Sequence, residues 1–295
     1  MSNNHIAKND KELYTVMKRA WRVHSQILPY DHSIAFKGYD IYSWIVFANN
    51  LGGDHRSFVE FSKRYDLDRL AQNSSEPEKI ESYNDRLGIF IADVSGHSFE
   101  DILLVHNLHS SLFTALPYEL EMNGYISSQI FCNLNNRIFN STAPGKFISA
   151  IYAELLADKR MRFLIAGHPH PLIYDCRLKE FRKIDFKSSV PLGLFPSRGS
   201  IDLDPEKDKP EKKVSFHFND ICLPDSFVAV LYTDGIPEVE DKAGDSFGME
   251  RLKQVISQNA HNNAQEIFRQ ILIATNKHAG DAGALDDRTM VIIKC

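Results

Sequence analysis

The chain lacks the features that would commit it to a membrane or to an oxidising compartment. Its longest apolar run near the C-terminal end, residues 227–231, is the size of a strand and too short to cross a bilayer. The N-terminal segment MSNNHIAKNDKELY is polar and charged, unlike the hydrophobic region of a secretory signal. The few cysteines are far apart and form no CxxC pair, which argues against a disulfide framework or a zinc site: Cys132, Cys176, Cys222 and Cys295. We therefore expect a cytoplasmic protein with reduced thiols.

The chain also has only a small excess of negative over positive charge. The 295-residue chain has a formal net charge of −5, and its 43% hydrophobic and 25% charged residues are typical of a globular protein with one large domain or two small ones. No basic run is interleaved with aromatic residues, so we expect no nucleic-acid partner. The P-loop motif GxxxxGK(S/T) is absent, and no cysteine lies in a phosphate-cradling loop. P-loop and phosphocysteine chemistry therefore have no support.

The first 38 residues contain an amphipathic pattern. Apolar residues recur at helical spacing and Pro29 ends the run: Leu13, Val16, Met17, Ala20, Trp21, Ile27 and Leu28. The stripe either packs on its own domain or forms a dimerisation or regulatory helix. We expect an N-terminal helical segment at 1–38, too short for a sensor domain, followed by one domain at 39–295.

From Tyr39 onward the pattern changes to short strand-like runs. These are YDIYSWIVFA, RLGIFIADV, KFISAIYAELL, MRFLIAG, PLIYDC, KKVSFHF, SFVAVLYTD and RTMVIIK. Helical stretches are expected between Ser98 and Phe139 and over 249–257 and 264–278, with surface loops at 63–85 and 196–213. Clustered strands and clustered helices predict an α+β protein with antiparallel sheets.

Acidic residues follow or precede several of these strands. Asp54 ends the tight turn LGGD, Asp93 ends GIFIAD, and Asp234 ends VAVLYTD. Asp286 and Asp287 lead into the last strand. A single Asp beside Gly is usually a turn residue, because its side chain bonds to nearby backbone. Several at strand ends would repel one another if those ends converge, and bound cations are the simplest way to offset that repulsion.

Oxygen ligands without a matching His or Cys set favour Mg²⁺ or Mn²⁺. Two such ions about 3.5–4 Å apart can share a water, lower its pKa and neutralise charge on a phosphoryl oxygen. A phosphate ester is the natural substrate of that arrangement.

At this point the sequence resembles a known family. The segments LGGD, FIADVSGH, FISAIYAEL, FLIAGHPHPLI, VPLGLFP, LYTDGIPEVED, FGMERL and DDRTMVII are similar, in order, to those of the PPM metal-dependent serine/threonine protein phosphatases, and within them to the bacterial SpoIIE/RsbU branch. The similarity runs from about Gln26 to Lys294. It implies two packed antiparallel β-sheets flanked by helices, an αββα sandwich with two metal ions at one end.

The resemblance also implies roles for individual residues. Asp54, Asp93, Asp234 and Asp286 match the metal-binding aspartates, with Asp93 bridging, and the Val94 carbonyl matches an adjacent backbone ligand. Asp287 would then support the site from behind or be purely structural. Ser57 and Ser98 depart from the family pattern, which commonly has an acid and a glycine at these positions.

Other polar residues near these motifs have two interpretations. His97 and His168 either donate a proton to the leaving oxygen or bond to backbone in their turns, and the second interpretation is favoured. Arg56 is either a phosphate contact or a solvated surface charge.

The leading hypothesis is hydrolysis of phosphoserine or phosphothreonine on a STAS-domain anti-sigma-factor antagonist in a partner-switching pathway, an expectation that comes from the resemblance alone. The alternative is a catalytically weak relative that binds a partner, with Ser57 as its main support. A third hypothesis is a hydrolase of small phosphate esters.

Overall fold

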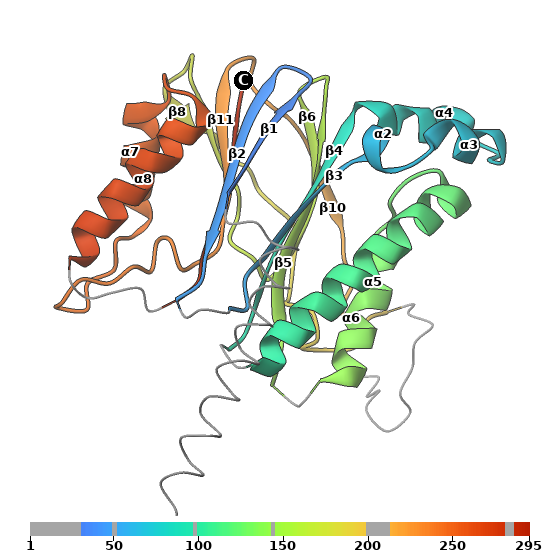
Figure 1. Ribbon diagram of the computed structural model, residues 1–295, viewed down its shortest axis with the longest axis horizontal. Coiled ribbons are helices and arrows are strands. Elements are labelled where there is room, and N and C mark those ends of the chain that lie inside the picture. Colours follow the sequence, from blue (N-terminus) through green and yellow to red (C-terminus); the bar gives the residue numbers. More distant parts are fainter. Residues whose placement is uncertain (1–30, 49–51, 97–98, 143–144, 199–212, 281–285) are drawn as a thin grey trace, which may run out of the picture.

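Two β-sheets pack face to face, and helices cover the outer face of each (Figure 1). The computed structural model describes residues 31–48, 52–96, 99–142, 145–198, 213–280 and 286–295. The predicted αββα sandwich is confirmed. The predicted N-terminal helix at 13–28, His97, Ser98 and most of the predicted loop at 196–213 lie outside the described residues.

The first sheet has the strand order β1-β2-β12-β11-β7-β8, and every neighbouring pair is antiparallel. Its strands are β1 (Asp31–Phe36), β2 (Tyr39–Val46), β7 (Leu172–Asp175), β8 (Glu180–Phe181), β11 (Phe227–Tyr232) and β12 (Arg288–Lys294). All six residues of β11 are buried, because one face packs on the second sheet and the other on helices. Strand β1 pairs with β2, so the sheet begins before Tyr39.

The second sheet has the order β10-β6-β5-β4-β3, again antiparallel, and a short strand pairs with β6 in parallel. Its strands are β3 (His55–Glu60), β4 (Arg86–Val94), β5 (Ile148–Leu156), β6 (Arg160–Ala166), β9 (Ser188–Ser189) and β10 (Phe218–Cys222). The strand predicted over 212–218 starts only at Phe218 and continues to Cys222, because the polar segment Asn219–Asp220 pairs along the edge of β6. Burial between the sheets stabilises the fold by about 1.5–3 kcal/mol for each large apolar side chain.

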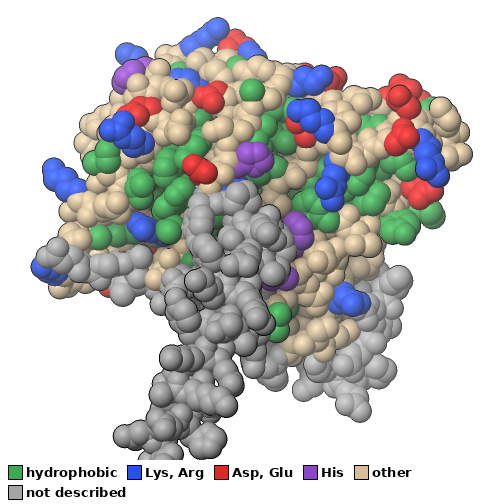
Figure 2. Space-filling model, viewed as in Figure 1, with side chains coloured by type: hydrophobic (Ala, Val, Ile, Leu, Met, Phe, Trp, Pro, Cys, Tyr) green, Lys and Arg blue, Asp and Glu red, His purple; other side chains and the backbone are tan. Residues whose placement is uncertain are grey.

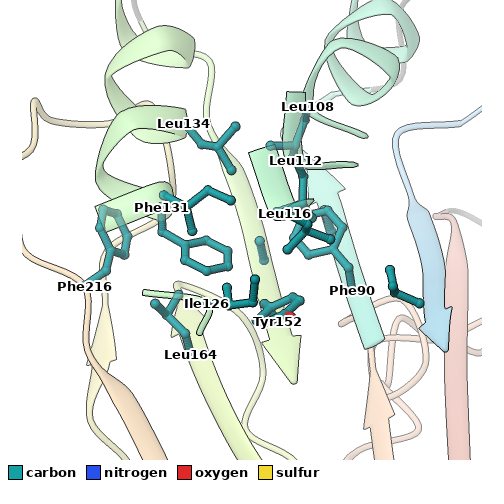
Figure 3. Packing of buried hydrophobic residues seen from close by; sticks show 14 of the residues in the cluster. Phe90, Leu108, Leu112, Leu116, Ile126, Phe131, Leu134, Tyr152, Leu164 and Phe216 are labelled. Carbon is teal, nitrogen blue, oxygen red and sulfur yellow. The ribbon is translucent and has the colours of Figure 1, made fainter. Parts of the chain in front are cut away.

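Long helices cover the sheets as the sequence predicted. Helices α5 (Phe99–Asn123) and α6 (Gln129–Ser141) lie on the second sheet, and α7 (Met249–Asn259) and α8 (Ala264–Ala279) lie on the first. Figure 3 shows Leu108, Leu112 and Leu116, which are four residues apart on α5 and therefore on one face, pointing into the core of this layer.

The prediction of a surface loop over 63–85 was wrong. This segment contains α2 (Phe61–Arg64), α3 (Leu67–Gln72), α4 (Pro77–Glu81) and a 3₁₀ turn (Ser82–Asp85). Leu67, Ile80 and Tyr83 are buried in the same core as α5. Its polar composition concealed a few apolar residues at helical spacing, which suffice to fix short helices against an existing core.

The surface is of mixed charge. Acidic and basic side chains are interspersed over the face shown in Figure 2. Among the described residues, no helix has the length and apolar character needed to span a membrane.

Candidate active site

The predicted aspartates lie at strand ends on one end of the sandwich. Asp93 is the penultimate residue of β4, and Asp54 immediately precedes β3, whose His55 pairs with Ala92. In the first sheet, Asp234 follows β11 and Asp286 precedes β12, and these two strands are paired there through Tyr232 and Met290. In Figure 1 this end lies at the bottom, where β4 leads into α5.

Asp287 has a structural function. Its Oδ1 accepts a hydrogen bond from the Ala48 amide at 2.8 Å, and its Oδ2 accepts bonds from the amides of Gly53 at 2.7 Å and Asp54 at 3.3 Å. A Cβ on Gly52 would lie 1.9 Å from Asp287 Oδ2, so only glycine allows this approach. Asp287 thus holds the turn that presents Asp54, the supporting role that the sequence left open for it.

Asp54 is anchored from across the sandwich. It is only 1% exposed, and its Oδ2 accepts hydrogen bonds from the hydroxyls of Thr233 at 2.9 Å and Thr289 at 2.6 Å. Burial, followed by the neighbouring charge of Asp93, raises the pKa of Asp54 well above its ordinary value, and the threonine hydroxyls oppose the shift. The two threonines were missed by sequence reasoning, since only the fold brings them to Asp54.

Asp93 is the most central of these acids. Burial raises its pKa to about 8, with further contributions from the charges of Asp234, Asp286 and Asp287 and an opposing hydrogen bond with Asp54. Burial and the charge of Asp286 also raise the pKa of Asp234.

The backbone beside Asp93 faces the same turn. The Val94 amide donates to the Gly53 carbonyl at 3.3 Å, and a Cβ on Gly53 would lie 3.0 Å from the Val94 carbonyl oxygen. That oxygen therefore lies against the turn that carries Asp54.

The donor set fits hard divalent cations. Several carboxylates repel one another in a partly buried position, and Mg²⁺ and Mn²⁺ prefer oxygen ligands. In the part of the chain that the structure describes, no three His, Cys, Asp or Glu side chains are already grouped closely enough to hold one ion. The charges of Asp234 and Asp286 act on Asp93, so these carboxylates lie within electrostatic range of one another.

Two other predicted residues have structural surroundings. His168 is buried, its Nδ1 lies 2.9 Å from Ser149 Oγ, and burial lowers its pKa to about 3, so it is neutral at pH 7 and not an acid. Arg56 is neither a phosphate contact nor a surface charge: it is 3% exposed, and its Nη1 donates to Ser43 Oγ at 2.8 Å. The sequence interpretation of Arg56 was wrong because β3 is buried on the side where Arg56 points.

A histidine pair next to Asp54 was also missed. His55 Nε2 lies 3.0 Å from His109 Nδ1 and 3.1 Å from Ser57 Oγ. This contact joins β3 to α5, and Ser57 contributes to it at the position where relatives commonly have an acid.

Similarity to known proteins agrees with this geometry. The family described as Stage II sporulation protein E (SpoIIE) matches residues 83–295. The chain belongs to the SpoIIE family. This membership makes the chain a serine/threonine protein phosphatase, a hydrolase. No curated protein is similar enough to count as a relative.

Several solved structures share the fold. The SiaA-PP2C domain of Pseudomonas aeruginosa superposes with a TM-score of 0.67 at 14% identity, covering 98% of each chain. The PP2C phosphatase domain of SpoIIE from Bacillus subtilis, with a fragment of its regulatory domain, gives 0.59 at 15% identity over 87% of this chain and 63% of that one. The RsbU and RsbW domains of Rv1364c from Mycobacterium tuberculosis give 0.58 at 19% identity, covering 87% and 59%.

Proposed function

We propose that this SpoIIE-family phosphatase is metal-dependent and removes phosphate from phosphoserine or phosphothreonine. Asp54, Asp93, Asp234 and Asp286, with the Val94 carbonyl, would hold two Mn²⁺ or Mg²⁺ ions. Such ions, when bound, lower the pKa of a water and neutralise charge on the phosphoryl group. The crowding of carboxylates around Asp93, with Asp54 buried and the others partly buried, carries this proposal, because a site of like charges is stable only with protons or cations between them.

The remaining residues of the site position these ligands. Thr233 and Thr289 fix the rotamer of Asp54, and Asp287 fixes the turn before it. Because the buried His168 is neutral, we assign it no proton transfer.

Hydrolysis of p-nitrophenyl phosphate tests the metal mechanism. We expect Mn²⁺-dependent activity in the wild type, none in Asp93→Asn or Asp234→Asn, and unchanged activity in Asp225→Asn, whose carboxylate is exposed on a distant loop. Circular dichroism establishes that the variants fold. Full activity of Asp93→Asn, or activity in EDTA, would refute the assignment.

For the substrate, we propose a phosphorylated STAS-domain anti-sigma-factor antagonist in a partner-switching pathway. Support comes from family membership and from the neighbour in which an RsbU domain accompanies an RsbW domain. The alternative, a weak relative that only binds its partner, predicts Mn²⁺ binding by calorimetry without turnover of either p-nitrophenyl phosphate or phosphoprotein. A preference for small phosphate metabolites over phosphoprotein would favour the third hypothesis.

We also propose that the N-terminal helix expected at 13–28, ahead of the phosphatase domain, mediates homodimerisation or docks an activator. Strand β1 belongs to the sheet, so a deletion should end before Asp31. Removal of residues 1–30 should lower either the number of subunits per particle, measured by light scattering, or the activity. A variant that is unchanged in both refutes the proposal.

A further inference from the structure

A second pocket lies at the opposite end of the second sheet. It has a volume of about 540 Å³ and is bounded by α4 and by the adjoining ends of β4, β5, β6 and β10. Four of its lining residues are cationic: Lys79, Arg86, Arg160 and Arg162. Tyr125, a residue that is 39% exposed, and Asp220 also line it.

The pocket wall holds more guanidinium groups than there are buried carboxylates beneath it. Arg86 and Arg162 share one fully buried carboxylate, that of Glu154, at 2.7 and 3.9 Å. The side chains of the two arginines are only 16% and 20% exposed. Arg160 and Lys79 form ion pairs with the exposed Asp158 and Glu76, and pairs of that kind are weak in water. Two half-buried guanidinium groups thus share one buried carboxylate, and Asp220 is the carboxylate in the pocket wall itself.

The two inner arginines are held in place before any ligand arrives. Arg162 stacks on the Phe218 ring at 3.7 Å and donates from Nη1 to the Ile126 carbonyl at 3.0 Å. Arg86 stacks on the Tyr83 ring at 4.2 Å and donates from Nη2 to Ser82 Oγ at 3.0 Å. Such fixed, planar donors lose little entropy when they bind an anion.

We propose that this pocket binds a small phosphorylated molecule, with its phosphate on the arginines and its organic part against Tyr125. Arginine forks match phosphate geometry, and the volume suits a ligand of nucleotide size. Arg86 is the first residue of β4 and Asp93 the eighth, so the rise of a strand puts the pocket about 23 Å from the candidate metal centre. It is therefore a separate site and not an extension of the active site.

Calorimetry in EDTA tests the proposal without relying on the proposed phosphatase mechanism. Without metal, the carboxylate-rich active site repels anions, so bound phosphate reports the second pocket. The probes are GMP, AMP, ribose 5-phosphate and inorganic pyrophosphate, with guanosine as the probe that lacks phosphate. We expect at least one phosphorylated probe to bind, guanosine not to bind, and Asp93→Asn to retain the binding.

The variants address residues on the rim, whose loss the fold tolerates. Arg160→Gln with Lys79→Gln should weaken binding at least about tenfold, since each removes a charged contact. Arg177→Gln, which removes an exposed cation on a different loop, should leave the affinity unchanged. Both variants should retain wild-type hydrolysis of p-nitrophenyl phosphate.

The relative affinities of the probes identify which kind of phosphorylated molecule the pocket prefers. Nucleotides binding more tightly than ribose 5-phosphate would support stacking of a base on Tyr125, and equal affinities would support recognition of the phosphate and sugar alone. Failure of every phosphorylated probe to bind at millimolar concentration, equal binding of guanosine and GMP, or wild-type affinity in the double rim variant would overturn the proposal.

Discussion

Replacing Lys146 with methionine should destabilise the protein and weaken its response to metal. Lys146 Nζ donates to Asp101 Oδ1 at 2.6 Å and to the Ser95 carbonyl at 3.1 Å. It thereby ties the first turn of α5 to the loop that follows Asp93 and Val94. Ser95 is fixed in turn to Phe147 by two further hydrogen bonds of 3.0 Å.

The size of the effect follows from burial. The Asp101 side chain is 2% exposed and that of Lys146 is 31% exposed. Breaking a fully buried ion pair costs about 3–5 kcal/mol, but water can reach the space left by Lys146 and offset part of that cost. We expect a loss of about 2 kcal/mol in the free energy of unfolding, roughly thirtyfold in the folded-to-unfolded ratio.

Urea denaturation in EDTA measures this loss, and the Mn²⁺ concentration for half-maximal hydrolysis of p-nitrophenyl phosphate should rise in the same variant. Lys253→Met is the matched control, because its pair with Glu250 is exposed, and it should change stability by less than about 0.5 kcal/mol. Asp101→Asn and the double variant complete a cycle. Additivity within about 0.5 kcal/mol would refute the coupling, and an unchanged Mn²⁺ requirement would refute the link to the site.

Three further predictions concern the site and its support. Thr289→Val removes the 2.6 Å hydrogen bond to Asp54, so the pKa of Asp54 should rise further and Mn²⁺ affinity at pH 6.5, measured by calorimetry, should fall about tenfold; equal affinity would contradict the anchoring role. Gly52→Ala would place a methyl group on Asp287, and a folded protein with wild-type Mn²⁺ activity would contradict the need for glycine in this turn. His168 has a folded pKa of about 3, below its ordinary value of 6.5, so its stabilising contribution is complete above pH 6.5 and falls by about 1.4 kcal/mol per pH unit below it. His168→Asn should therefore flatten the loss of stability between pH 6.5 and pH 4 in urea denaturation, and an unchanged slope would contradict this assignment.

The strands that could be predicted are those buried on both faces. RLGIFIADV and FVAVLY are nearly continuous apolar runs, and β4 and β11 follow them closely. The strand β3, HRSFVE, was missed because His55 and Arg56 are polar although buried. Their environment depends on β4 and α5, which are distant in sequence, so no local pattern indicates it.

The candidate site also contains residues that could be predicted from the sequence and residues that could not. Strand ends and turn glycines made the aspartates visible, and the family resemblance ordered them. The partners of those aspartates were not predictable: Thr233 and Thr289 belong to the first sheet, and they matter only because its end meets Asp54 across the sandwich. Contacts between sheets carry no periodic signal in sequence.

The carboxylates of neighbouring acids in this site differ in the groups that stabilise their negative charge. Asp287 is buried, yet three backbone amides bond to its carboxylate and oppose the rise in its pKa that burial causes. Asp93 is only partly buried, but that burial and the charges of Asp234 and Asp286 raise its pKa to about 8. A carboxylate already stabilised by amides gains little from a cation, whereas one that is destabilised by its neighbours gains most. The bonds from three amides therefore give Asp287 a structural role, whereas Asp93, which faces other carboxylates, is the acid better suited to the proposed metal binding.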